Sequence, residues 1–202
     1  LMFACYLGNK KIIRLLLSYG ADASRRTLNS GKSSFDILMS GLADQETVQE
    51  SGALLIRKMQ QISILNQDGL SALHYAVLRS SNKLVKIIIN KFENERHDWL
   101  RMIFTSNKKI QPHAGFDYCL LHGQFDMLST LLLAALDGYG SHQDGILSYI
   151  NKRKCFDRAI MNKLSQESLL KFQKILLNKK FKLIQRKTKL LTQITKLIKL
   201  SG

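Results

Sequence analysis

The sequence is poor in proline and cysteine, and it has no long apolar run. It contains one proline in 202 residues, which disfavours a many-turned β-sandwich and leaves helices uninterrupted. Its three cysteines are odd in number and include no Cys-x-x-Cys pair, which argues against a disulfide framework. The longest apolar run, residues 131–136, is too short to cross a membrane. We therefore expect a folded protein in a reducing, intracellular compartment, without membrane anchor or signal peptide.

Acidic residues are scarce in the last quarter of the chain, so the net charge of +16 is unevenly spread. Residues 151–202 hold 15 Lys/Arg and 2 Asp/Glu, a balance of +13, whereas residues 1–150 hold 16 and 13, a balance of +3. Apolar residues at helical spacing with lysines opposite predict a basic amphipathic helix over residues 178–202. Such a helix fits either a cap on the last repeat or a site for anionic phosphate.

One stretch, residues 66–91, combines a turn with two short apolar helices. The turn contains Gly69, and glycine accepts the positive φ that such turns need. Ser71 follows as a helix N-cap, and Leu73 and Ala76 then fall on one helical face. The pattern Gly-x-Ser-Ala-Leu-His-x-Ala in this stretch resembles the ankyrin repeat motif T-P-L-H-x-A.

The first residues of the chain carry the most specific form of this pattern. By spacing, Ala4 matches Ala76 and Gly8 matches Ser80. The letters LLLSYGAD that follow resemble the LLL-x-x-GAD close of ankyrin repeats, with Gly20 as a helix-ending residue in the left-handed conformation. The pattern begins in mid-repeat, from which we expect the natural protein to extend upstream.

Weaker copies follow along the chain. Apolar anchors equivalent to Leu73 stand at positions 1, 35, 73, 116 and 156, separated by 34, 38, 43 and 40 residues. The first separation is close to the ankyrin period of about 33, and the others require insertions. We place the second helix of the copy at Phe35 within residues 48–62. The resemblance implies an all-α, ankyrin-type helix-turn-helix solenoid of about five repeats over residues 1–177, followed by an irregular basic C-terminal helix over residues 178–202.

Motifs for catalysis are weak. Gly-Lys-Ser at positions 31–33 resembles the end of a P-loop, but Arg26 stands where the first glycine of that motif belongs, so a repeat turn is favoured. The ankyrin resemblance implies that His74 forms hydrogen bonds within its repeat. The five histidines show no metal-ligand spacing. We expect no metal and no cofactor.

The cysteines and acids have simple structural interpretations. Cys5 and Cys119 occupy or adjoin small-residue positions of the repeat and are expected in the core. Cys155 has basic neighbours that would lower the pKa of its thiol, yet no His-Asp companion accompanies it. Asp36 and its counterparts recur with the repeat and are expected to cap or brace helices. These residues predict no enzymatic activity and no small-molecule substrate.

What remains is a surface for binding another protein. An ankyrin-like array exposes its turn tips and the ends of its first helices along a concave side, and apolar residues there with a polar rim mark a binding surface. We therefore expect this module to bind a partner protein through its concave face. The expected partner-binding residues are Tyr6, Leu7, Lys32, Gln67, Asp68, Leu70, Leu78, Arg79, Leu121, His122, Met161 and Asn162.

The composition, rich in Lys, Ile, Leu and Asn, resembles that of ankyrin-containing effectors of intracellular bacteria such as Legionella. This resemblance implies a host protein as the partner and the host cell interior as the location. Two other functions stay open. The repeats could recruit substrate for an upstream catalytic domain, or the C-terminus could bind an anionic membrane or nucleic acid. The residues expected to bind anions are Lys179, Lys180, Lys182, Arg186, Lys187 and Lys189.

Overall fold

A computed structural model describes residues 1–94, 115–137, 164–177 and 187–201 of the chain. The chain divides into two compact units, Leu1–Pro112 and His113–Gly202, and each is described by itself. The described residues form helices and contain no β-strand, which confirms the predicted all-α class. None of their helices is long and apolar enough to cross a membrane.

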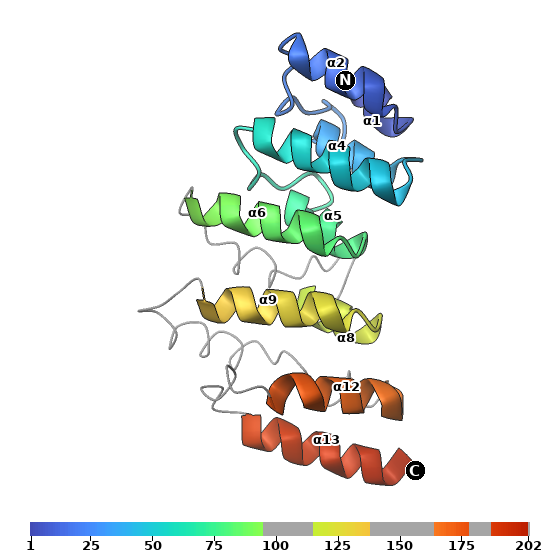
Figure 1. The fold of residues 1–202 in the computed structure, drawn as a ribbon, viewed down its shortest axis with the longest axis vertical. Coiled ribbons are helices and arrows are strands. Elements are labelled where there is room, and N and C mark those ends of the chain that lie inside the picture. The colour runs from blue at the N-terminus through green and yellow to red at the C-terminus, as the bar shows by residue number, and fades with distance from the viewer. Residues whose placement is uncertain (95–114, 138–163, 178–186, 202) are drawn as a thin grey trace. The chain divides into compact units, whose positions relative to one another are not determined.

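The first unit consists of three helix pairs stacked in two layers (Figure 1). The first layer contains the shorter helix of each pair, and the second layer contains the longer helix. Each helix contacts the neighbouring helix of its own layer, which belongs to the next pair. The first layer is α1 (Met2–Tyr6), α3 (Ser34–Ser40) and α5 (Ala72–Leu78), and the second is α2 (Lys10–Ser18), α4 (Gln45–Lys58) and α6 (Asn82–Asn94).

Polar side chains begin these helices. Ser33 and Asp36 form a capping box at α3, in which the Ser33 hydroxyl accepts from the Asp36 amide at 3.2 Å and an Asp36 oxygen accepts from the Ser33 amide at 2.9 Å. The predicted bracing role of Asp36 is therefore confirmed. Ser71 is the N-cap residue of α5, as predicted.

The longer helix of the second pair differs from its prediction at both ends. The sequence places it within residues 48–62, but α4 begins at Gln45 and ends at Lys58. It begins earlier because the Asp44 side chain accepts a hydrogen bond from the Thr47 amide at 2.7 Å, which caps the helix there. It ends earlier because Met59 has extended backbone angles.

Two features of the links between paired helices matter for the packing. The backbone is left-handed at Gly8 and Ser80, with φ of 68° and 54°, which confirms that these residues occupy equivalent positions. Gly41, between α3 and α4, has an ordinary φ of −87° but lies against α1. An ideal Cβ at Gly41 would lie 2.6 Å from the Tyr6 carbonyl oxygen, so only glycine fits without a shift.

The core of the first unit lies between the layers and between successive pairs. Phe35, Leu38 and Leu55 are fully buried there, and so is Leu84 of α6. Leu84 packs closely on α4, because an ideal Cβ at Gly52 would lie 3.0 Å from Leu84 Cδ1. Small residues thus let successive pairs approach each other.

The second unit contains four described helices, α8 (Gly115–Leu121), α9 (Phe125–Asp137), α12 (Gln166–Leu177) and α13 (Lys187–Ser201). Helix α8 pairs with α9, and α12 contacts both α9 and α13. Gly123, with φ of 66°, separates α8 from α9 as the sequence predicts. Phe172 of α12 and Ile194 of α13 are fully buried. The repeat count of five and the boundary at residue 177 stay predictions.

Candidate functional site

The segment before α3 folds into a tight hairpin, residues 26–33, which we call turn 1. Arg26 and Ser33 form an antiparallel β-bridge across its base. Within it, the Thr27 amide donates to the Lys32 carbonyl oxygen at 2.9 Å, and the Gly31 amide donates to the Thr27 carbonyl oxygen at 3.0 Å. Gly31 has φ of 64°, a left-handed value that glycine adopts without strain. Turn 1 is therefore closed by its own backbone.

Side chains add a second set of bonds to turn 1. The Thr27 hydroxyl accepts from the Lys32 amide at 3.0 Å and lies 2.7 Å from the Ser30 hydroxyl. Between these anchored residues, Leu28 has 97% of its surface exposed. An aliphatic side chain in water on a well-braced turn loses little conformational freedom on contact with a partner. Leu28 is thus a preorganised apolar contact point.

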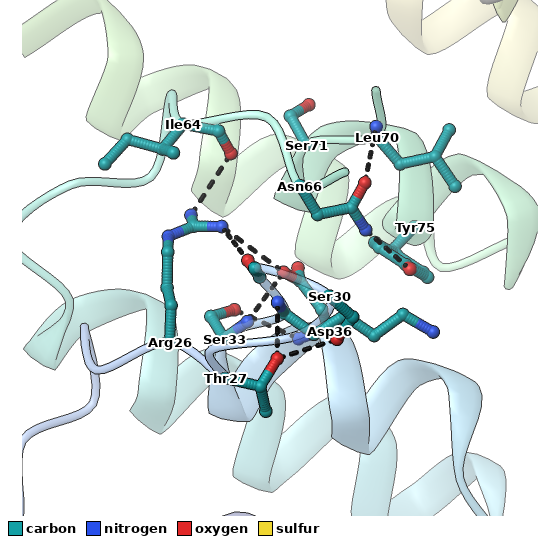
Figure 2. A network of polar contacts seen from close by, with 12 residues as sticks. Arg26, Thr27, Ser30, Ser33, Asp36, Ile64, Asn66, Leu70, Ser71 and Tyr75 are labelled. Carbon is teal, nitrogen blue, oxygen red and sulfur yellow. Dashed lines mark hydrogen bonds and ion pairs between the residues drawn. The ribbon is translucent and has the colours of Figure 1, made fainter. Parts of the chain in front are cut away.

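Arg26 connects turn 1 to the next repeat, as Figure 2 shows. Its guanidinium donates to the Gly31 carbonyl oxygen at 2.6 Å and to the Ile64 carbonyl oxygen at 3.1 Å. It also lies 3.8 Å from the buried Asp36 carboxylate. Burial raises the pKa of Asp36, while the bonds from Ser33 and the charge of Arg26 oppose that rise. The carboxylate is held among donors inside the fold and is not available as a catalytic base.

The corresponding turn before α5, residues 66–70, is called turn 2 and is organised by Asn66. The Asn66 amide donates to the Leu70 carbonyl oxygen at 3.0 Å, while its side-chain oxygen accepts from the Leu70 amide at 2.9 Å. Its side-chain nitrogen donates to the Tyr75 hydroxyl at 3.0 Å. The Gln67 amide then donates to the Ser30 carbonyl oxygen at 3.1 Å, which ties turn 2 to turn 1. The two turns form one continuous hydrogen-bonded edge.

Two cations of the third pair reach back to helix ends of the second pair. Arg79 donates to the carbonyl oxygens of Met39 at 2.5 Å and Gly41 at 3.1 Å, at the end of α3. Lys91 donates to the carbonyl oxygen of Ile56 at 2.9 Å and to that of Met59, at the end of α4. The last carbonyls of a helix lack partners within the helix, and a cation there also meets the negative end of the helix dipole. Arg79 and Lys91 therefore join neighbouring pairs.

Residues 1–28 match the model of the ankyrin repeat family. This segment is therefore similar to an ankyrin repeat. A search of the curated proteins returned no match. The match ends within turn 1, and the two helix pairs that follow repeat the same arrangement of turn, short helix and longer helix. Ankyrin repeats generally bind proteins, so the match suggests a protein-protein interaction module.

The structure exposes some of the predicted partner-binding residues. Tyr6 and Leu7, at the end of α1, are 47% and 49% exposed. Gln67 and His122 are also exposed. Half-buried positions are occupied by Lys32, Asp68, Leu78 and Leu121. The role of these residues in binding stays a prediction.

Two of the predicted partner-binding residues stabilise the fold instead. Leu70 is only 7% exposed, so the expectation that it lies on the surface is wrong. The Asn66 side chain closes turn 2 onto the Leu70 amide and holds that residue against the repeat. Arg79 is half-buried and bonded to the end of α3, so its guanidinium is already engaged within the array.

Several predictions fall on residues that the structure does not describe. Met161 and Asn162 lie outside the described residues, and so do Cys155, Lys179, Lys180, Lys182 and Arg186. Lys187 and Lys189 belong to α13. The anion-binding prediction for this basic segment therefore stays a prediction.

Sequence reasoning missed the most exposed apolar residues of the first unit. Leu28 in turn 1 is 97% exposed, Tyr19 at the end of α2 is 83% exposed, Phe3 on α1 is 74% exposed, and Leu42 after α3 is 71% exposed. Ile64 and Leu65, which precede turn 2, are 38% and 45% exposed. The sequence does contain a signal for Leu28, because a leucine stands within a Thr-x-Asn-Ser-Gly turn where polar residues are the rule.

The reactive groups of the described residues serve the structure. Cys5 and Cys119 are buried as predicted, and burial raises the pKa of their thiols to about 11 and about 12, which keeps them protonated and inert. His74 Nδ1 accepts from the Ser71 amide at 3.1 Å, the predicted bond within the repeat. Ser33 of the Gly-Lys-Ser segment caps α3. In the described parts of the chain, no three His, Cys, Asp or Glu side chains gather as metal ligands.

Proposed function

We propose that the first unit binds a partner protein through the edge formed by turns 1 and 2 together with the adjoining first layer. The observation that carries this proposal is Leu28, an aliphatic side chain 97% exposed on a turn that backbone and side-chain bonds hold in place. Ile64 and Leu65 place further exposed apolar surface beside the neighbouring turn. Lys32 and Gln67 supply a polar rim.

Rigidity favours this edge as a binding site. A mobile loop loses conformational entropy when a partner fixes it. Turn 1 is already fixed by the hydrogen bonds that Arg26 and Thr27 form within it and by its bond to turn 2. Burying one leucine side chain contributes about 2 kcal/mol, which corresponds to roughly a 30-fold change in affinity. Tyr6 and Leu7 would extend the contact along the first layer.

Site-specific photo-crosslinking tests this proposal even though the partner is unidentified. A photoreactive amino acid is placed at position 28 of the full chain, and a control variant carries it at position 15, where Leu15 of the second-layer helix α2 is 55% exposed and lies outside the proposed surface. We expect one dominant protein adduct from position 28 in cell lysate and little from position 15. With the purified partner, Leu28→Ala should weaken binding at least tenfold and Leu15→Ala less than twofold. Equal adducts from both positions, or no loss with Leu28→Ala, would overturn the proposal.

The compositional resemblance to bacterial effectors extends the proposal to a host protein as the partner and the host cell interior as the location. The same crosslinking variant tests whether the partner is a eukaryotic or a bacterial protein. The expected result is a specific adduct in lysate of eukaryotic cells and none in bacterial lysate. A specific adduct only in bacterial lysate would contradict this part of the proposal while leaving protein binding intact.

A second candidate function is anion binding by α13. Ile194 is buried while Lys196 and Lys199 of the same helix are exposed, so α13 keeps basic side chains in water as it packs. Binding of the full chain to vesicles containing anionic lipid should then fall steeply between about 50 and about 200 mM salt, because salt screens such contacts. Lys196→Gln with Lys199→Gln should reduce it. Unchanged binding by that double variant would rule out this role for α13.

A further inference from the structure

A groove opens on the second layer of the first unit, where three successive helices meet. It has a volume of about 430 Å³ and is lined by Arg14 of α2, by Glu50, Ala53, Leu54 and Arg57 of α4, and by Lys83 of α6. Ligand sites in proteins commonly occupy about 300–1,000 Å³. The groove is therefore large enough for a few side chains of a peptide. It shares no residue with turns 1 and 2.

The one carboxylate of the groove already has cationic partners. Glu50 Oε2 accepts a hydrogen bond from Arg14 at 2.9 Å and also pairs with Lys10, which does not line the groove. The hydrogen bond from Lys10, followed by the charges of Lys10, Arg14 and Lys83, keeps the pKa of Glu50 below its usual value. Glu50 is thus a carboxylate whose charge is balanced locally.

The remaining cations of the groove have no such partner. Arg57 and Lys83 make no hydrogen bond or ion pair with any residue that the structure describes, and both are exposed. They come from adjacent helices and line the same groove. Three cations against one carboxylate leave the lining with an excess of positive charge. That excess favours an anionic ligand.

The floor of the groove is apolar, which narrows the chemistry of the ligand. Ala53 is buried and Leu54 is half-buried. Both line the groove on α4, the middle one of its three helices. A phosphate or a nucleic-acid backbone offers nothing apolar to this floor. A peptide satisfies both the excess of positive charge and the apolar floor, because it carries a carboxylate and an aliphatic side chain on one short segment.

We propose that this groove binds an acidic peptide segment of a partner, in which a Glu or Asp side chain lies close to an aliphatic one. The carboxylate lies between Arg57 and Lys83, where the planar guanidinium can donate two parallel hydrogen bonds. The aliphatic side chain rests on Ala53 and Leu54. This site is independent of the turn edge, so either one can fail while the other stands.

Fluorescence anisotropy with a short labelled peptide that contains two glutamates beside a leucine tests the proposal on the full chain. We expect saturable binding that the all-glutamine analogue lacks. Arg57→Gln and Lys83→Gln should each weaken binding about three- to tenfold, the effect of losing one charge-assisted hydrogen bond at a partly exposed site. The matched controls are Lys58→Gln and Lys86→Gln, which remove the same charge from exposed positions of the same helices outside the groove.

The outcomes separate a built site from general charge attraction. Equal weakening by the groove and control variants would mean that the peptide senses only the basic surface and would overturn the proposal. Equal binding of the glutamine analogue, or the absence of saturation up to millimolar peptide, would overturn it as well. Inorganic phosphate that displaces the peptide at equal concentration would reassign the groove to a simple anion. Circular dichroism and melting temperature confirm that each variant remains folded.

Discussion

Among the residues that the structure describes, the two units join neighbouring helices with different kinds of bond. In the first unit, Arg79 and Lys91 bind main-chain carbonyl oxygens at helix ends of the preceding pair. In the second unit, α12 meets α13 through buried apolar residues and a bond from Gln173 to the exposed Thr195 hydroxyl at 3.1 Å. Main-chain carbonyl oxygens are present at the end of a helix whatever its side chains are. The first unit therefore fixes its register through groups that every repeat possesses.

The sharpest way to break the first unit is to separate its first two pairs. Gly41→Ala places a methyl group about 2.6 Å from the Tyr6 carbonyl oxygen and 2.9 Å from that of Ile37. We expect a loss of about 3 kcal/mol in the free energy of unfolding, at the upper end of overpacking effects. Urea denaturation measures the loss, and amide exchange shows whether it is confined to the first unit.

Gly20→Ala is the matched control for Gly41→Ala. Nothing lies within 4 Å of an ideal Cβ at Gly20, so only the cost of its φ of 83° applies. That cost is about 1 kcal/mol. A loss for Gly41→Ala no larger than that for Gly20→Ala would show that the contact between α1 and α3 tolerates a side chain.

Replacing Arg79 tests directly how much its bonds to main-chain carbonyl oxygens of the second pair contribute to stability. Arg79→Met leaves the carbonyl oxygens of Met39 and Gly41 without their donor, while keeping an aliphatic stem in place. We expect a loss of about 2 kcal/mol in the free energy of unfolding, as for hydrogen bonds from a charged group. Lys86→Met, which changes an exposed lysine of α6, should cost less than about 0.5 kcal/mol. Similar losses for both variants would mean that Arg79 contributes no more than a surface charge.

The stability of the first unit should depend on pH in the alkaline range because of Tyr75. Burial raises the pKa of this phenol to about 12, from about 10 in the unfolded chain. The unfolded state therefore loses its proton first, and the stability present below pH 10 falls as the pH rises toward about 12. One pKa unit corresponds to about 1.4 kcal/mol, so we expect a decline of about 2 kcal/mol over this interval.

The difference between wild type and Tyr75→Phe isolates this contribution. The variant loses the bond from Asn66 and should be about 1 kcal/mol less stable at neutral pH. Because it has no phenol to ionise, the gap between the two proteins should close as the pH rises above 10, and Tyr75→Phe should be the more stable of the two near pH 12. A gap that stays constant to pH 12 would contradict the raised pKa of Tyr75.

The smallest effect concerns the link between paired helices, which both units share. Ser80 in the first unit and Gly123 in the second unit have φ of 54° and 66°. Ser80→Gly should stabilise the first unit by about 0.5 kcal/mol, because glycine removes the strain but adds freedom to the unfolded chain. Gly123→Ser should destabilise the second unit by about 1 kcal/mol. Changes of the same sign would show that the two links are not equivalent.

Much of the local structure follows from the sequence, because it depends on neighbours along the chain. The motif correctly predicts the N-cap Ser71, a hydrogen bond of His74 within its repeat, the left-handed Gly20 and the buried Cys5. Each of these depends on residues within a few positions. The periodicity of the apolar residues predicts the helix pairs for the same reason.

The contacts between repeats could not be predicted in this way. The motif places Arg79 among the partner-binding residues, yet Arg79 bonds to carbonyl oxygens 38 and 40 residues earlier in the chain. It places Leu70 on the surface, yet Asn66 holds Leu70 inward. It does not mark Leu28, because the exposure of Leu28 depends on how turn 1 is braced. Spacing identifies equivalent positions, but it does not determine what a side chain meets in the neighbouring repeat.

The bonds from Arg79 and Lys91 make the second pair dependent on the third. Each of these two donors belongs to the third pair, and each of their acceptors belongs to the second. A chain cut after α4 would leave these carbonyl groups without their donors, even though both helices of the second pair would be present. Loss of the third pair during evolution would therefore also destabilise the second. We expect neighbouring repeats of this unit to be inherited together.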